Sequence, residues 1–349
     1  MNIDLLRRLC ETPGVPGHEH RVRALIQDEI KGLFDEVTVD PMGSLLCRRD
    51  SRKAPRKGAP KKVMLLCHMD EIGFLVSHVT DKGFLHVQPV GGFDARNLFS
   101  RRVLVSTDDG DFKGVMNPGG KPIHISSPEE RKKIPEPKDF VVDLGLGEKT
   151  KDVINVGDMV TMDEPLIEIG EKVVSKALDN RIACWLGIEA VKGLGKARHE
   201  CEIHVAFTCQ EEVGLRGART SSFAIKPDIG LGVDTTLACD TPGVPEQDRT
   251  TVQGNGFGLH VKDSSFIADR DLVKEFEALA QKEKIPFQRT MLAAGGQDGA
   301  AAQQAAAGAK AVGIVVGTRY IHTVTEMIHK SDLQAALDVL VAYLKKAKS

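Results

Sequence analysis

Four short, mainly apolar runs constrain the fold of this 349-residue chain more than any other feature of its sequence. They occupy residues 63–67, 203–208, 229–233 and 311–316. Such runs are typical of strands that are covered on both faces of a sheet. Apolar residues recur at helical spacing over residues 181–194, 269–284, 297–307 and 331–346. Buried strands that alternate with helices predict an α/β fold, in which helices cover both faces of the sheet.

Residues 73–165 have a different pattern from the rest of the chain. Short alternating segments such as 84–88 and 140–144 are separated by frequent Gly and Pro, with little helical periodicity. This pattern is typical of a small β-barrel or sandwich. The region begins just after one predicted strand of the α/β sheet and ends just before a predicted helix. We therefore expect an α/β domain formed by residues 1–72 and 166–349, with an all-β, barrel-like domain inserted at 73–165.

The charge balance argues against two classes of partner. Lys and Arg number 47 and Asp and Glu 49, so the formal charge is 47 − 49 = −2, too small to attract nucleic acid or an anionic membrane. One basic stretch, residues 48–62, has no aromatic residue to stack on bases, and we interpret it as a solvated loop. No apolar stretch approaches the roughly 20 residues that span a bilayer. We expect neither a nucleic-acid nor a membrane partner.

Cysteine usage indicates a reducing compartment. The seven cysteines form no C-x-x-C pair, and several lie inside apolar runs, where Cys behaves as a small buried hydrophobe. A disulfide scaffold is not expected. The first ten residues carry an early acid and no long apolar core, so no secretory signal is predicted. These features together predict a cytoplasmic protein.

Side chains of the types that bind metals lie directly after the predicted strands or at the start of a helix. They are His68, Asp179, Glu211, Glu212, Asp234 and His322. Because sites in open α/β sheets form beyond the carboxyl ends of the strands, these groups can converge despite their separation in sequence. Two imidazoles and three carboxylates suit a pair of borderline ions such as zinc or cobalt. Two ions about 3.5–4 Å apart can share a carboxylate and a water molecule whose pKa they lower.

The adjacent glutamates can divide the chemistry between them. Neighbouring residues at the end of a strand project in different directions, so one can ligate a metal while the other acts as general base. Asp70, two residues after His68, is expected to accept the second imidazole N–H and fix its tautomer. Singly, a histidine after a strand, an aspartate before a helix or a pair of glutamates has an ordinary structural explanation. Their combination at successive strand ends is what favours a metal site.

Longer motifs surround these residues. They read Cys-His-Met-Asp-Glu-Ile-Gly at 67–73, Leu-Asp-Asn-Arg at 178–181, Glu-Glu-Val-Gly-Leu-Arg-Gly-Ala at 211–218 and Thr-Arg-Tyr-Ile-His at 318–322. The chain thereby resembles the glutamyl aminopeptidase family, which includes the tetrahedral aminopeptidases and proteins once labelled endoglucanases. Further similar stretches lie at 12–19, 121–131 and 295–298, so the resemblance covers nearly the whole chain.

The resemblance implies a zinc-aminopeptidase-like fold, with a mixed sheet sandwiched by helices and a small inserted β domain. It also implies two divalent metal ions, zinc or cobalt, held by His68, Asp179, Glu212, Asp234 and His322. Among these, His68 and Asp234 each hold one face of the cluster, and Asp179 bridges both ions. Glu212 and His322 complete the second metal position.

The same resemblance assigns the catalytic roles. Glu211 is the implied general base, which takes a proton from the bridging water and passes it to the leaving amine. Asp70, through the tautomer of His68, is the second catalytic residue that we predict, from its position in the sequence. The resemblance also implies a cis-type peptide bond after Asp179. It implies a peptide substrate whose free amino group binds near the metals, so that cleavage is limited to N-terminal residues. Homo-oligomers, from dimers to a hollow dodecamer, are implied, with the inserted domain supplying contacts.

Two departures from the family pattern bear on the substrate pocket. Relatives commonly continue with Ser-Pro after the last motif, whereas this chain has Thr323 and Val324. Where Gly-Gly-Thr-Asp-Ala is usual, this chain reads Gly-Gly-Gln-Asp-Gly, with Gln297 at the centre. Neither position is a proposed ligand, so the departures affect side-chain preference, which the sequence leaves open.

Alternatives remain at this point. A dimetal deacylase or carboxypeptidase could use the same ligands with a different pocket, and a non-catalytic oligomeric scaffold could retain the fold alone. A glycosidase would require a pair of unligated carboxylates. The segment His18-Glu19-His20 looks metal-binding, but residues two apart at the start of a helix do not face each other. We expect these three to be polar surface residues.

Overall fold

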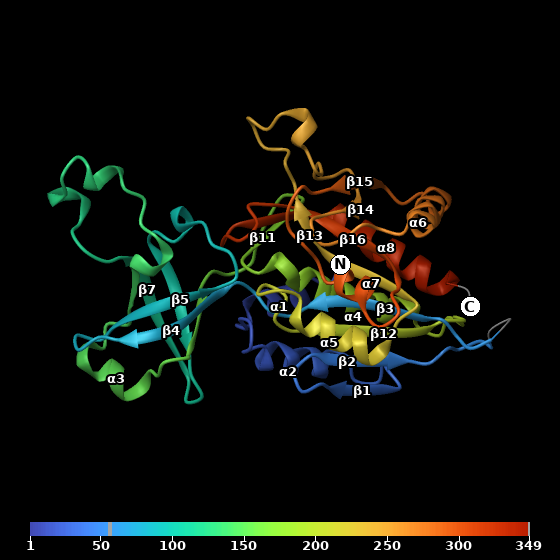
Figure 1. Ribbon diagram of the computed structural model, residues 1–349, viewed down its shortest axis with the longest axis horizontal. Coiled ribbons are helices and arrows are strands. Elements are labelled where there is room, and N and C mark those ends of the chain that lie inside the picture. The colour runs from blue at the N-terminus through green and yellow to red at the C-terminus, as the bar shows by residue number, and fades with distance from the viewer. Residues whose placement is uncertain (55–57, 348–349) are drawn as a thin grey trace.

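The computed structural model describes residues 1–54 and 58–347, so residues 55–57 of the basic stretch lie outside the described part. Figure 1 shows two bodies: a large mixed sheet flanked by helices, and a smaller β-barrel to its left. The sheet has 11 strands and the barrel is closed by six, in the order β4-β5-β8-β7-β6-β9. The predicted fold class, a mixed sheet sandwiched by helices together with a small barrel-like sheet, is confirmed.

Along its main path, the large sheet is parallel at its centre and antiparallel toward both ends. Its main path runs β1 (Glu36–Val39), β2 (Leu45–Arg49), β12 (Glu202–Thr208), β3 (Lys62–His68), β13 (Ile229–Leu237), β16 (Lys310–Arg319), β17 (Glu326–His329), β11 (Lys172–Ser175) and β10 (Ile167–Ile169). Beside this path, β14 (Phe257–Lys262) pairs with β16, and β15 (Phe287–Met291) pairs with β14. Strands β12, β3, β13 and β16 are mutually parallel, so their carboxyl ends meet at one edge.

Helices cover both faces of this sheet. They are α1 (Ile3–Glu11), α2 (His20–Glu29), α4 (Leu178–Leu194), α5 (Arg216–Ile225), α6 (Arg270–Glu283), α7 (Gly299–Gln304) and α8 (Lys330–Lys346). In β3, Val63 and Leu65 belong to the large core on the face covered by α1, α4 and α8. Met64 and Leu66 belong to a smaller core on the opposite face, with residues of α5 and α7. This two-sided burial explains why β3 appears in the sequence as a continuous apolar run.

Two predicted helices are shorter in the structure. The pattern over residues 297–307 becomes α7, because residue 305 adopts an extended backbone and ends the helix. Residues 18–33, where apolar positions also recur at helical spacing, form the helix α2 over His20–Glu29 only. The apolar spacing continued past the point at which the backbone leaves the helix, a boundary that periodicity alone does not mark.

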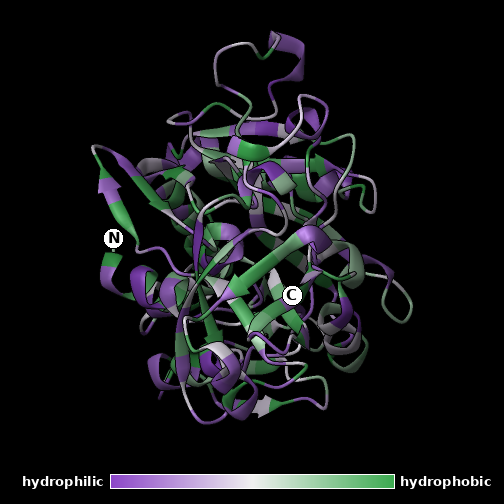
Figure 2. Cartoon of the chain, turned by 90° about the vertical axis from the view of Figure 1, so that its left-hand side faces the viewer, coloured by the Kyte–Doolittle hydropathy of each residue, from purple (hydrophilic) through white to green (hydrophobic). Residues whose placement is uncertain are grey.

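The barrel is antiparallel throughout and encloses its own apolar core. Its strands are β4 (Gly73–Val79), β5 (Phe84–Val90), β6 (Arg101–Ser106), β7 (Asp111–Pro118), β8 (Phe140–Asp143) and β9 (Met159–Met162), with the short helix α3 (Thr150–Val153). Short 3-10 turns lie at Ala95–Asn97, Ile123–Ile125, Glu130–Lys132, Pro137–Asp139, Gly147–Lys149 and, outside the barrel, Glu246–Asp248. Seen from the barrel side, hydrophobic and hydrophilic residues interleave along the strands (Figure 2). The division into domains at residues 73 and 165 stays a prediction.

Two further sequence expectations concern the cysteines and the membrane. All seven cysteines are free, and six of them are buried, Cys239 being the exception. Burial raises the pKa of the Cys67 thiol well above its usual range, consistent with an inert core residue. Within the described residues, no helix is both long and apolar enough to cross a bilayer.

Candidate metal centre

The proposed ligands come together at the edge where the parallel strands end. His68 is the last residue of β3 and pairs in register with Thr208, the last residue of β12. Glu211 and Glu212 lie in the loop after β12, and Asp234 lies in β13. The two remaining groups arrive from outside these strands: Asp179 lies in the first turn of α4, and His322 follows β16. Residues up to 254 positions apart therefore share one site, from His68 to His322.

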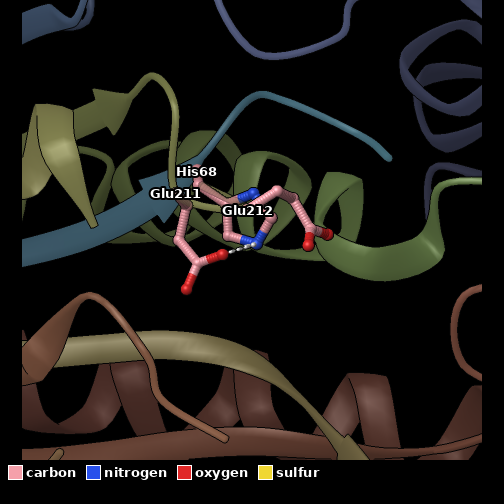
Figure 3. Close-up of side chains that lie close together, drawn as sticks. All are labelled: His68, Glu211 and Glu212. Atoms are coloured by element: carbon pink, nitrogen blue, oxygen red, sulfur yellow. Dashed lines mark ion pairs between the residues drawn. The ribbon is translucent and has the colours of Figure 1, made fainter. Parts of the chain in front are cut away.

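His68 is at the centre of one half of the cluster. Its Nε2 atom lies 3.4 Å from Asp179 Oδ1, 3.8 Å from Glu211 Oε2 and 4.0 Å from Asp234 Oδ1. Figure 3 shows that the side chain of Glu211 turns its carboxylate toward the His68 ring, while that of Glu212 points away to the other side. The two adjacent glutamates thus face different parts of the site.

His322 is at the centre of the other half. Its Nε2 atom lies 3.6 Å from Asp179 Oδ2 and 3.5 Å from Glu212 Oε1. Asp179 therefore turns one carboxylate oxygen toward His68 and the other toward His322. That is the arrangement which a carboxylate bridging two ions requires.

The donor set fits divalent ions in size and in type. Ligand atoms on a tetrahedral zinc ion, with bonds of about 2.0–2.1 Å, lie roughly 3.3 Å apart. The separations of 3.4–3.6 Å that join Asp179 and Glu212 to the imidazoles are close to this value. Three groups have ligand atoms all within 4.8 Å of one another: His68, Asp179 and Asp234; Asp179, Glu212 and His322; and His68, Glu211 and Glu212.

The protonation equilibria reveal an excess of buried negative charge. Burial raises the pKa of Glu211 well above its usual value, and the carboxylates of Asp298, Asp234 and Glu212 raise it further, against the opposing effect of His68. Burial likewise raises the pKa of Asp234. Cations bound here would offset the repulsion among these carboxylates.

The imidazoles and Asp179 respond in the opposite sense. Burial alone would lower the pKa of His322, but the carboxylates of Asp179 and Glu212 raise it to about 11. Burial also opposes the protonated form of His68, yet Glu211, Asp179 and Asp70 raise its pKa well above the usual value. For Asp179, burial favours the neutral acid, but the two imidazoles together hold its pKa below the usual value. In the absence of metal, the carboxylates around both imidazoles therefore favour their protonated forms.

Asp70 holds the site in a different way from that expected. The main-chain carbonyl of Asp70 accepts a hydrogen bond from His68 Nδ1 at 3.0 Å, whereas its carboxylate oxygen lies 3.6 Å away. The carboxylate instead accepts the main-chain N–H groups of Glu211 and Glu212, at 3.1 and 3.0 Å. Asp70 is 0% exposed, and a buried carboxylate needs donors close by. One residue thus fixes both the tautomer of His68 and the loop that carries the glutamates.

Glu19 was expected at the surface, and that expectation is wrong. It is 3% exposed, and its Oε1 atom accepts the main-chain N–H groups of Gly17 and Gln210, both at 2.9 Å. Gln210 has a positive φ of 56° and directly precedes Glu211. Glu19 and Asp70 together hold three consecutive amides of the loop, those of residues 210–212.

Glu326 has an equivalent place at the other half of the cluster and was not identified from the sequence. It is 2% exposed, and it accepts the main-chain N–H of Asp179 at 2.9 Å and that of His322 at 2.8 Å. The only local sign is an acid at the start of a short strand, four residues after His322. The peptide bond that follows Asp179 is cis, as the resemblance implied.

A cavity opens beside the second half of the cluster. Asp179 and His322 form part of its wall. The apolar part of its lining comes from Ile72, Phe93, Leu98, Met162 and Val324. The departures at Thr323 and Val324 therefore do line a cavity next to the cluster, whereas Gln297 is buried and does not line it.

Comparison with known proteins agrees with this geometry. The model of the M42 glutamyl aminopeptidase family matches residues 50–339. This chain belongs to the M42 family. A relative from Acetivibrio thermocellus is 37% identical over 341 residues, which is 97% of each chain.

Two solved structures extend the M42 likeness to three dimensions. The TET aminopeptidase of a marine-sediment Thaumarchaeota archaeon is 30% identical, with a TM-score of 0.94 over 99% of this chain and 96% of that one. The TET1 peptidase of Pyrococcus horikoshii, which can assemble into a tetrahedron or a large octahedral shell, is 30% identical, with a TM-score of 0.86 over 98% of each chain. Membership of the M42 family places this chain among metal-dependent aminopeptidases.

Proposed function

We propose that this chain is a dinuclear metallo-aminopeptidase that removes N-terminal residues from peptides. The observation that carries the proposal is the orientation of Asp179, whose two carboxylate oxygens face His68 and His322 at 3.4 and 3.6 Å. In this proposal Asp179 bridges two divalent ions, with zinc or cobalt favoured by the mixture of nitrogen and oxygen donors. His68 and Asp234 hold the first ion.

Of the remaining side chains, two bind the second metal ion and one transfers the proton. Glu212 and His322 hold the second ion, on the side of the cavity. The ions supply Lewis-acid polarisation of the scissile carbonyl and lower the pKa of the attacking water. Glu211 accepts the proton of that water and returns it to the leaving amine. The Glu211 carboxylate lies 3.8 Å from His68 Nε2 and is not a proposed ligand, which leaves it free to exchange a proton with that water.

The charge of the site also favours a substrate with a free amino terminus. Asp234 and Asp298 are buried acids near the cluster, and Glu211 is a partly buried one. An α-ammonium group approaching them is attracted, whereas a blocked terminus is not. A carboxypeptidase would instead bring a carboxylate toward these acids. This is why we favour an aminopeptidase over the alternative dimetal deacylase or carboxypeptidase.

The proposal includes an assembly of several copies in the cytoplasm. Relatives of similar fold form tetrahedral and octahedral shells, and we propose a homo-oligomer between a dimer and a dodecamer, with the barrel of residues 73–165 supplying contacts. Free cysteines throughout the chain suit a reducing compartment. Sedimentation of the purified chain would measure the number of copies.

A paired assay tests the function. Chelation should abolish hydrolysis, and added zinc or cobalt should restore it, on a peptide with a free amino terminus. The same peptide with an acetylated terminus should remain intact. Cleavage of the acetylated peptide would replace the aminopeptidase by a deacylase or carboxypeptidase. Purified protein that neither contains nor responds to metal would support a non-catalytic scaffold.

A further inference from the structure

Glu326 joins two proposed ligands that reach the cluster from different elements. It opens strand β17, where it pairs in register with Ser175 of β11. Its Oε2 atom accepts the N–H of Asp179 and its Oε1 atom accepts the N–H of His322, at 2.9 and 2.8 Å. Among the described residues, no Lys or Arg lies within 4.0 Å of this carboxylate as an ion pair. Its interactions are therefore with main-chain amides of the site.

The backbone at His322 needs this support. Both Tyr320 and His322 have positive φ values, 59° and 64°, a region that non-glycine residues rarely adopt. The bond from His322 N–H to Glu326 ties this turn to β17. The second oxygen extends the same tie to Asp179, 147 residues away in sequence. The carboxylate therefore sets how far the bridging ligand lies from the imidazole of the second metal position.

We propose that Glu326 is a positioning residue which determines the affinity of the second metal position, that of Glu212 and His322, without touching the ion. The inference rests on the proposed two-metal function. Asp70 holds His68, a ligand of the first position, through its carbonyl, and the loop of Glu211 and Glu212 through its carboxylate. Glu326 holds Asp179, which belongs to both positions, and His322, which belongs to the second alone. Loss of Glu326 should therefore weaken the second position more than the first.

The chain contains a matched control for this inference. Asp332, in α8, is also buried and accepts two main-chain N–H groups, those of Gly254 and Gly256, at 2.7 and 2.9 Å. Neither glycine belongs to the metal cluster. Removing Asp332 thus abolishes the same kind of contact in the same fold, and separates a general loss of stability from a specific loss at the metals.

The experiment titrates cobalt into the full-length chain after chelation, and follows visible absorption and competition with a chromophoric chelator. In Glu326→Ala one of the two affinities should fall by about 10–100-fold, the usual effect of removing a group that orients ligands. The other affinity should fall less, because only Asp179 of the two groups that Glu326 holds belongs to the first position. Glu326→Gln, which keeps one acceptor oxygen, should lie between Glu326→Ala and wild type. Asp332→Ala should keep both affinities, even if its Tm falls.

His322→Ala identifies the position affected. It should weaken the same position as Glu326→Ala does. The double variant should bind metal at the remaining position no more weakly than Glu326→Ala alone. Wild-type affinities in both Glu326 variants, or equal losses at both positions, would overturn the inference. If Glu326→Ala does not fold, Glu326→Gln decides by the same criteria. A wild-type chain that binds only one ion would instead overturn the proposed two-metal function.

Discussion

The large sheet buries charged side chains at its carboxyl edge, whereas the described barrel residues bury none. At the carboxyl edge of the sheet, His68, Asp70 and Asp234 are all buried, and Glu19 and Glu326 are buried beside them. Over residues 73–162, all of which the structure describes, the buried polar side chains are Ser106, Thr107, Thr150 and Thr161, and none is charged. Two sheets of one chain thus have very different interiors.

The difference follows from where main-chain amides are free. A buried carboxylate is costly unless donors surround it. Loops that leave parallel strands, such as the one at residues 210–212, offer consecutive N–H groups that no strand uses, and Asp70 and Glu19 accept them. In the barrel, every strand pairs with a neighbour on both sides, so the hydrogen bonds between strands use the main-chain amides of those strands. Chemistry is therefore concentrated on the sheet, while the barrel contributes apolar wall such as Phe93 and Met162.

The largest expected effect comes from Glu211→Gln at the sheet edge. An amide cannot accept the proton of the attacking water, so kcat should fall by about 10²–10⁴-fold. Metal content, measured by mass spectrometry, should match the wild type, because Glu211 is not a proposed ligand. The control Glu129→Gln alters an exposed glutamate in the barrel region and should leave kcat unchanged. An active Glu211→Gln enzyme would rule out Glu211 as the general base.

Metal affinity should rise with pH. In metal-free protein the pKa of His322 is about 11 and that of His68 is well above its usual value, so both rings carry protons at pH 7. An incoming ion must displace them, and lower pH strengthens the competition. Each displaced proton should tighten binding by about tenfold per pH unit. Zinc titrations against a competing chelator between pH 6 and 8 measure this slope, and a flat profile would contradict the charge state inferred for the cluster.

Breaking a buried ion pair in the α/β domain should lower the free energy of unfolding more than breaking an exposed pair in the barrel region. Glu71→Gln leaves Lys176 and Arg181 buried without their carboxylate, which lies 2.7 and 3.3 Å from them. The free energy of unfolding should fall by about 3–5 kcal/mol. Glu164→Gln breaks the solvent-accessible pair with Arg102 and should cost no more than about 1 kcal/mol. Denaturant unfolding of both variants tests the contrast, and equal losses would contradict it.

A cavity in the barrel should leave the metals unaffected. Leu85 is fully buried in β5, and Leu85→Ala should destabilise the chain by about 2–5 kcal/mol. Because no proposed ligand lies in the barrel core, metal affinity should equal that of wild type. Calorimetry and cobalt titration on the same sample measure both quantities. A large loss of cobalt affinity would show that the two regions are coupled more closely than their interiors suggest.

Much of the fold was predictable because burial on both faces leaves a local trace. The apolar runs marked β3, β12, β13 and β16, and the shared edge of those strands explains why the residues that follow them converge. The edge strands were not predicted. β1 has no buried residue, and β10 has none either, so neither has the continuous apolar run by which the central strands were found.

The supports of the cluster were harder to predict than its ligands. His68 and His322 are chemically distinctive, whereas Glu19 and Glu326 act on main-chain N–H groups that every residue but proline carries. Glu19 reaches an amide 191 residues away, and Glu326 one 147 residues away. Such a contact constrains one partner only, so it leaves no paired signal in a single sequence. Only the folded chain reveals it.

The hydrogen bonds from main-chain N–H groups to Asp70 and Glu326 have a practical consequence for changing the ligands. Asp70 and Glu326 hold the main-chain N–H groups of Glu211, Glu212 and His322 rather than their side chains, so these contacts should survive most side-chain replacements. Replacing Glu212 or His322 by another metal-binding residue should change the preferred ion without loosening the backbone. Proline would remove the N–H group, and the positive φ of 64° at His322 would also disfavour a β-branched residue.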